Sequence, residues 1–143
     1  MPKTPIKKKR SPRKVSVGGR QPGHPVPGLI GPLLEFDLAA ETNQLRLEEA
    51  WKTTSRNAKT LVKYPDLRIV LIAMKSGTRM EGHKADGSIS IQTLTGLLRL
   101  HLVDQTVDLP AGCLLTLERA LPHDVEAVED RSFLLTISWP RGA

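Results

Sequence analysis

The chain has 143 residues, a net charge of +6, a single cysteine and only five aromatic residues. This length fits one modest domain with an extension, and a lone cysteine excludes an intrachain disulfide, so the fold must rest on a buried apolar core. No apolar run approaches the roughly 18 residues of a membrane span, and the N-terminus lacks the apolar centre of a signal peptide. We therefore expect a soluble, cytoplasmic protein with no membrane partner.

The positive charge is concentrated at the N-terminus. Eight basic residues lie between Lys3 and Arg20, the first 30 positions hold no acidic residue, and the remaining chain has 13 basic against 15 acidic residues. Residues 1–32 also contain seven of the 11 prolines and five of the 11 glycines. Such a segment buries too little apolar surface to offset its ordering entropy, which predicts a disordered basic tail over residues 1–32.

Two roles stay open for this tail. The stretch KKKRSPRK could lie along phosphates, because each neutralised phosphate releases counterions, but it carries no aromatic residue for base stacking. A solubilising extension is favoured over a sensor or scaffold whose tail contacts nucleic acid. The second role predicts salt-sensitive binding that disappears when residues 1–32 are deleted.

The folded body, residues 33–143, is predicted to begin at Leu33, where glycine and proline become sparse. Between Ala39 and Trp51 the apolar spacing fits both a helix face and a strand, and we predict a short helix there. Beyond it, apolar alternation between turn signals predicts strands, and residues 67–74 are apolar enough for a strand buried on both faces. The predicted strands cover 56–63, 67–74, 79–83, 89–94, 97–103, 106–109, 113–118, 123–128 and 132–139. Strands at this spacing with no long helix between them indicate an all-β antiparallel sandwich or barrel.

Two histidines occupy matching places in this strand pattern. Gly77 is followed after five residues by His83, and Gly96 closes that segment; later, LPAG and a strand lead to His123. This order of turns, strands and histidines resembles the cupin superfamily, in particular its small single-domain RmlC-like members. The resemblance covers about residues 67–139 and implies a single antiparallel jelly-roll barrel.

The chain departs from the metal-ligand pattern of that superfamily. Metal-binding cupins supply three histidines and one glutamate from the two motifs, whereas here Ala85 stands at the second histidine position and Ile89 at the glutamate. In the second motif Glu118 replaces a proline and Ala120 replaces a glycine. The resemblance is therefore specific for the fold and weak for a metal site.

Three interpretations of His83 and His123 stay open. With Glu81 they would form a three-ligand set for one divalent metal ion, since Glu81 lies two residues before His83 on one strand face unless Gly82 forms a bulge. Without a metal, the two histidines, Glu81 and Gln92 would line a ligand pocket, where a histidine pair suits a carboxylate or phosphate. In the third interpretation, both histidines lie inside the barrel and form hydrogen bonds with neighbouring groups, without a ligand or a metal.

We favour a small-ligand-binding or degenerate cupin barrel of unknown specific activity, with a pocket near His83 and His123. The alternative function is a metal-dependent cupin enzyme of the oxygenase or isomerase type, and the sequence names no catalytic residue. The predicted pocket walls are Ile89, Ile91, Leu98 and Leu117.

Residues outside this pattern are predicted to have structural roles or to face solvent. Arg99 and His101 alternate with leucines and are predicted to face solvent, and Cys113 is predicted to be a small buried residue. Small barrels gain by covering their edge strands, so we expect a homodimer. The aromatic residues that could close the barrel or contact a second copy are Trp51, Phe133 and Trp139.

Overall fold

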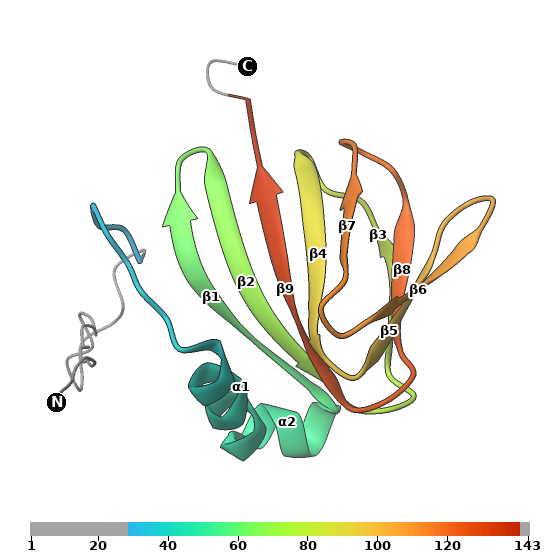
Figure 1. Ribbon diagram of the computed structural model, residues 1–143, viewed down its shortest axis with the longest axis horizontal. Coiled ribbons are helices and arrows are strands. Elements are labelled where there is room, and N and C mark those ends of the chain that lie inside the picture. Colours follow the sequence, from blue (N-terminus) through green and yellow to red (C-terminus); the bar gives the residue numbers. More distant parts are fainter. Residues whose placement is uncertain (1–28, 141–143) are drawn as a thin grey trace, which may run out of the picture.

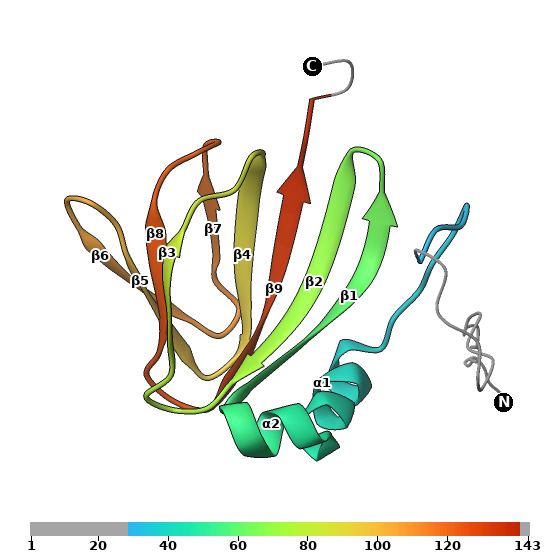
Figure 2. The same ribbon diagram turned by 180° about the vertical axis from the view of Figure 1, so that it is seen from behind.

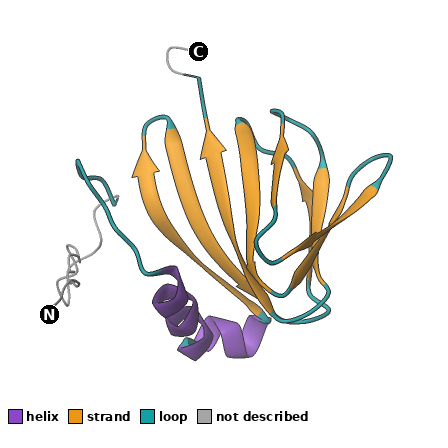
Figure 3. Cartoon of the chain, in the orientation of Figure 1, coloured by secondary structure: helices purple, strands orange, loops and turns teal. Residues whose placement is uncertain are grey.

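The computed structural model describes residues 29–140, and these form two short helices followed by nine strands (Figure 3). The helices are α1 (Leu38–Leu47) and α2 (Glu49–Thr54). The strands are β1 (Arg56–Tyr64), β2 (Leu67–Met74), β3 (Arg79–His83), β4 (Ser88–Thr95), β5 (Leu97–His101), β6 (Thr106–Pro110), β7 (Leu114–Leu117), β8 (His123–Ala127) and β9 (Arg131–Ser138). Neither described helix has the length and apolar character that crossing a bilayer requires. Residues 1–28 of the predicted tail lie outside the described residues.

The described strands form two antiparallel sheets whose inner faces pack against each other (Figures 1 and 2). The larger sheet has the order β1-β2-β9-β4-β7, and the smaller has the order β3-β8-β5-β6. Both sheets contribute to one core, which consists of Ile72, Met74, Ile89, Ile91, Leu98, Leu100, Leu109, Leu117, Val125, Ala127 and Phe133. The predicted all-β antiparallel architecture is confirmed.

Strand β2 is buried on both faces, as its apolar run predicts. Ile72 and Met74 point into the core between the sheets. Leu71 and Ala73 point the other way, into a second apolar cluster that includes Leu45 of α1. None of these four β2 side chains is more than 5% exposed. The outer face of the larger sheet is therefore apolar like its inner face, and the helices cover it.

The helical region contains two helices where the sequence predicts one. Helix α1 begins at Asp37, whose carboxylate accepts a hydrogen bond of 3.1 Å from the backbone N–H three residues on. Glu48 interrupts the helix in an extended conformation, and α2 then buries Trp51. The charged groups of Arg46 and Lys75 lie 5.5 and 5.4 Å from the Trp51 ring centre, so Trp51 anchors the helices and is not an exposed contact residue.

The segment before α1 lies against β1. The Tyr64 hydroxyl donates a 2.7 Å hydrogen bond to the Gly31 carbonyl, and the Lys63 N–H reaches the Leu29 carbonyl at 3.5 Å. Leu34 and Phe36 pack on the outer apolar cluster. Residues 29–32, which the sequence assigns to the tail, therefore contact the folded body.

The outer face of the smaller sheet carries paired charges. The register places Arg79, Glu126, Arg99 and Asp108 side by side across four strands, so that positive and negative groups alternate. Arg99 Nε lies 2.6 Å from an Asp108 oxygen, and this hydrogen bond holds the pKa of Asp108 below its ordinary value. His101 Nε2 lies 2.6 Å from Glu126. The predicted outward direction of Arg99 and His101 is confirmed.

A buried arginine fixes one end of the barrel. Arg131 is fully buried, and its Nη1 donates to the backbone carbonyl of Leu97, at the start of β5. Burial lowers the pKa of this guanidinium, an effect that the charges of Glu129 and Asp130 oppose. The bond ties the β4–β5 turn, which contains Gly96, to the first residue of β9.

We predict that Gly96→Ala is more destabilising than Gly112→Ala. Both glycines have a left-handed backbone, with φ of +76° and +86°, and each alanine would lose about 1–2 kcal/mol for that conformation. At Gly96 a new Cβ would also lie 2.6 Å from the Asp130 carbonyl oxygen, whereas at Gly112 it meets nothing within 4 Å. The clash should add about 1–3 kcal/mol to the loss in the free energy of unfolding. Denaturant titration of both variants checks this, and equal losses would contradict it.

Candidate functional site

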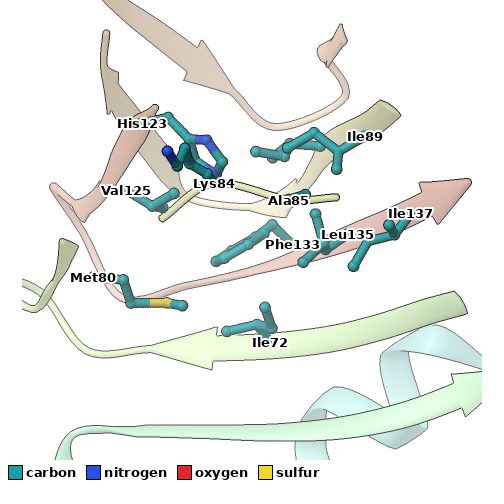
Figure 4. A pocket seen from close by; sticks show the side chains of 11 residues that line it. Ile72, Met80, Lys84, Ala85, Ile89, His123, Val125, Phe133, Leu135 and Ile137 are labelled. Carbon is teal, nitrogen blue, oxygen red and sulfur yellow. The ribbon is translucent and has the colours of Figure 1, made fainter. Parts of the chain in front are cut away.

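A cavity of about 180 Å³ lies between the two sheets (Figure 4). Strands β2, β3, β4, β8 and β9 and the β3–β4 loop line it. Among the described side chains, the polar residues of the lining are Lys84 and His123. The apolar residues in the lining are Ile72, Met80, Ala85, Ile89, Ile91, Val125, Phe133, Leu135 and Ile137.

Strand β9 supplies one wall of the cavity. Its alternation turns Phe133, Leu135 and Ile137 inwards in succession (Figure 4). Phe133 is 1% exposed, whereas Leu135 and Ile137 are half-buried. The wall is therefore most deeply buried at Phe133 and more accessible to solvent towards the end of the strand.

His123 is the buried polar group of the cavity. It begins β8, points inwards with Val125 and Ala127, and is 7% exposed. Its Nδ1 lies 3.0 Å from the Leu121 carbonyl oxygen, which can only accept a hydrogen bond. Nδ1 therefore carries a proton and donates it to this carbonyl. This bond also fixes the end of the β7–β8 loop.

A β-bulge in β3 sets the register in which the strand of the first histidine motif pairs with β8, the strand of the second. The pairing of β3 with β8 shifts between Met80 and His83, and the shift brings His83 opposite His123 in the backbone register. Glu81 lies within the bulged segment and is 73% exposed, with its carboxylate 3.7 Å from Arg79 on the outer face. The sequence predicts that Glu81 and His83 share one strand face unless Gly82 forms a bulge. The structure has a bulge in this segment.

The remaining predicted site residues are Gln92 and the four residues expected to form the pocket walls. Gln92 is exposed, and its β4 neighbours Ile91 and Thr93 are buried, so Gln92 faces away from the cavity. Ile89 and Ile91 line the cavity, as predicted. The other two predicted wall residues, Leu98 and Leu117, belong to the surrounding core but are not in the lining.

Lys84 is a lining residue that the sequence analysis missed. It directly follows His83 and precedes the apolar Ala85, so the only signal was its place inside the first motif. Lysines in loops are normally solvated, and neither spacing nor alternation assigns a direction to a residue just after a bulge. The structure places it at the cavity because the β3–β4 loop crosses there.

The two loops beside His123 are tied together. The Ala120 N–H of the β7–β8 loop donates a 3.0 Å hydrogen bond to the Ala85 carbonyl of the β3–β4 loop. Ala120 adopts φ +66°, the left-handed conformation that favours glycine. It stands where the resembling motif has glycine, the residue that adopts this conformation without strain.

The described side chains do not make up a metal-ligand set. Among them, no group of three or more His, Cys, Asp and Glu residues converges. Ala85 and Ile89, at two ligand positions of the motif, present hydrocarbon to the cavity, and the Lys84 ammonium adds a positive charge there. Divalent ions need several convergent N, O or S donors, so the described lining does not fit a metal ion.

By sequence, no family model and no curated protein matches the chain. Among solved structures, a protein of unknown function from Streptococcus pyogenes aligns with a TM-score of 0.63 at 23% identity, covering 79% of this chain and 93% of that one. An RmlC-like cupin from Desulfovibrio desulfuricans aligns at 0.55 with 25% identity, covering 59% and 83% of the two chains. The chain has the cupin fold. The same cupin barrel aligns with a variant of salicylate 1,2-dioxygenase from Pseudoaminobacter salicylatoxidans at 0.67 and 16% identity, covering 82% of this chain and 40% of that one.

We predict that Ala120→Gly stabilises this cupin barrel. Glycine relieves the left-handed strain of about 1–2 kcal/mol but adds about 0.4–1 kcal/mol of backbone entropy to the unfolded chain. The net gain in the free energy of unfolding should be about 0.5–1 kcal/mol. Ala111→Gly, in a turn residue without positive φ, is the matched control and should lose stability. A loss in both variants, measured by denaturant titration, would contradict the strain at Ala120.

We further predict that the purified, untagged protein carries far less than one metal ion per chain, because the described lining offers too few donors. Elemental mass spectrometry after incubation with Fe²⁺, Mn²⁺, Ni²⁺ or Zn²⁺ and desalting measures this. The double variant His83→Ala/His123→Ala gives the background, which wild type should match. About one ion per wild-type chain, absent from the double variant, would instead support the metal-dependent enzyme.

Proposed function

We propose that this cupin barrel binds a small organic molecule in the cavity beside His123, and that binding needs no metal ion. The observation that carries the proposal is the composition of the cavity, in which nine of the described lining residues are apolar and two are polar. Small-molecule sites combine apolar walls with a few placed polar groups in this way. The walls come from both sheets and from the β3–β4 loop.

The cavity size limits the ligand. An apolar cavity of about 150 Å³ accommodates benzene, so about 180 Å³ suits a body of roughly six to nine non-hydrogen atoms. Ligands of this size reach only modest affinity, and we expect dissociation constants on the order of 0.1–1 mM for unoptimised probes. The exposed end of the wall leaves room for a polar substituent.

The metal-dependent enzyme ranks second. One structural neighbour is a salicylate 1,2-dioxygenase, but at 16% identity the likeness lies in the fold, and a fold hosts many unrelated functions. Ligand binding relies only on the shape and chemistry of the cavity. We therefore test binding with a neutral probe, for which neither a metal nor a charge is needed.

The test uses benzyl alcohol and methyl NMR of protein labelled at isoleucine δ1. Four of the seven isoleucines line the cavity, namely Ile72, Ile89, Ile91 and Ile137. Ile30 is exposed, and Ile69 lies on the outer face of β2, so both act as internal references. We expect saturable shifts in the four cavity methyls and none in the two references. Uniform or absent shifts would overturn the proposal.

A filling variant provides the matched control. Ala85→Leu adds a branched side chain to the lining and should abolish the benzyl alcohol shifts. Ala111→Leu makes the same change at an exposed turn outside the lining and should leave them unchanged. Thermal unfolding of both variants verifies that they are folded. Unchanged binding in a folded Ala85→Leu protein would place the ligand elsewhere.

A further inference from the structure

We infer that the ligand of this cavity is a small organic monoanion, with an apolar body inside the barrel and a carboxylate at the rim beside Lys84. The inference rests on the proposed function and adds to it the charge and orientation of the ligand. It follows from the position of Lys84, from the ion pairs around the molecule, and from the cost of burying charge.

Lys84 combines an exposed position with a place in the cavity lining. The residue as a whole is exposed, yet it lines the same cavity as the buried Phe133 and Ile91. Figure 4 shows Lys84 and His123 at one end of the cavity, away from Ile72 on β2. A lysine in such a position covers apolar surface with its carbon stem and keeps its ammonium group in water.

No described carboxylate forms an ion pair with Lys84. Five ion pairs join described residues, and they engage Lys59, Arg79, Arg99 and His101 but not Lys84. Along the chain, the acidic residues closest to the two rim loops are Asp86 and Glu118, and both are exposed. Lys84 is therefore a cation at the cavity whose charge is open to an incoming anionic group.

The cost of desolvation fixes the orientation of the ligand. An anion placed deep among the apolar walls would lose its hydration without a partner, which is prohibitive. At the rim the same anion keeps part of its water and gains the field of the Lys84 ammonium. One formal cation at the rim matches one negative charge, and the cavity volume leaves about six to nine atoms for the body. A monocarboxylate with one ring or a short branched chain meets these conditions.

Benzoate and benzamide provide the test, because they share size and shape and differ in charge. Titrations followed by the four cavity isoleucine methyls give both dissociation constants. In wild type we expect benzoate to bind about fivefold more tightly than benzamide, the upper range for a partly exposed ion pair. Because that pair is screened, the preference should shrink in about 1 M salt. A purely apolar cavity would instead favour the neutral amide.

Lys84→Met isolates the charge, since methionine retains an unbranched apolar stem. We expect this variant to lose the preference for benzoate, so that its dissociation constants for benzoate and benzamide become equal. Lys52→Met, at an exposed residue of α2 outside the lining, is the matched control and should keep the preference.

The outcomes separate the two proposals. Equal binding of benzoate and benzamide by wild type, or an unchanged preference in Lys84→Met, would overturn the anion inference while leaving small-molecule binding intact. Failure of benzamide and benzyl alcohol alike to shift the cavity methyls would overturn the proposed function and this inference together. Benzoate shifts confined to Ile30 or Ile69 would mean that the anion binds outside the cavity, which also overturns the inference.

Discussion

Strand β9 holds the larger sheet together, because it is hydrogen-bonded to β2 on one side and to β4 on the other. It is the last strand of the chain, so the five-stranded sheet is complete only when residues 131–138 insert between strands formed from residues 67–74 and 88–95. This pairing is strongly non-local, and its loop-closure entropy must be recovered by burial on both sides. One wall of the cavity is part of the same strand, so the cavity and the closure of the barrel depend on one element.

The inner face of β9 also explains why the interior is filled at one end and hollow at the other. Arg131 and Phe133 are fully or almost fully buried, and Arg131 donates a hydrogen bond to the Leu97 carbonyl. Further along the strand, Leu135 and Ile137 become half-buried because the facing segments there are loops. A long cationic side chain and an aromatic ring thus plug one end, and aliphatic side chains of moderate length leave space near the rim loops.

The sequence predicts the strands well because each has an apolar face, and alternation reports that directly. Contacts between strands are harder to predict. Gly82 marks a place where a bulge can form, but whether the bulge between Met80 and His83 forms depends on the pairing of β3 with β8. Lys84 reaches the cavity only because that bulge and the following loop carry it there. The prediction of a buried Cys113 is wrong: the residue is exposed, because it belongs to the turn before β7 rather than to the strand.

The departures from the metal-binding motif act together on the chemistry of the cavity. Ile89 puts a branched hydrocarbon where the motif has a carboxylate, which removes a negative charge and enlarges the apolar wall. Ala85 puts a methyl group where the motif has an imidazole, and the neighbouring Lys84 adds a positive charge. The first two changes remove ligand atoms that a dication needs, and the positive charge of Lys84 repels a dication. For the organic anion that we propose, the same three residues supply apolar contact and a cation at the rim.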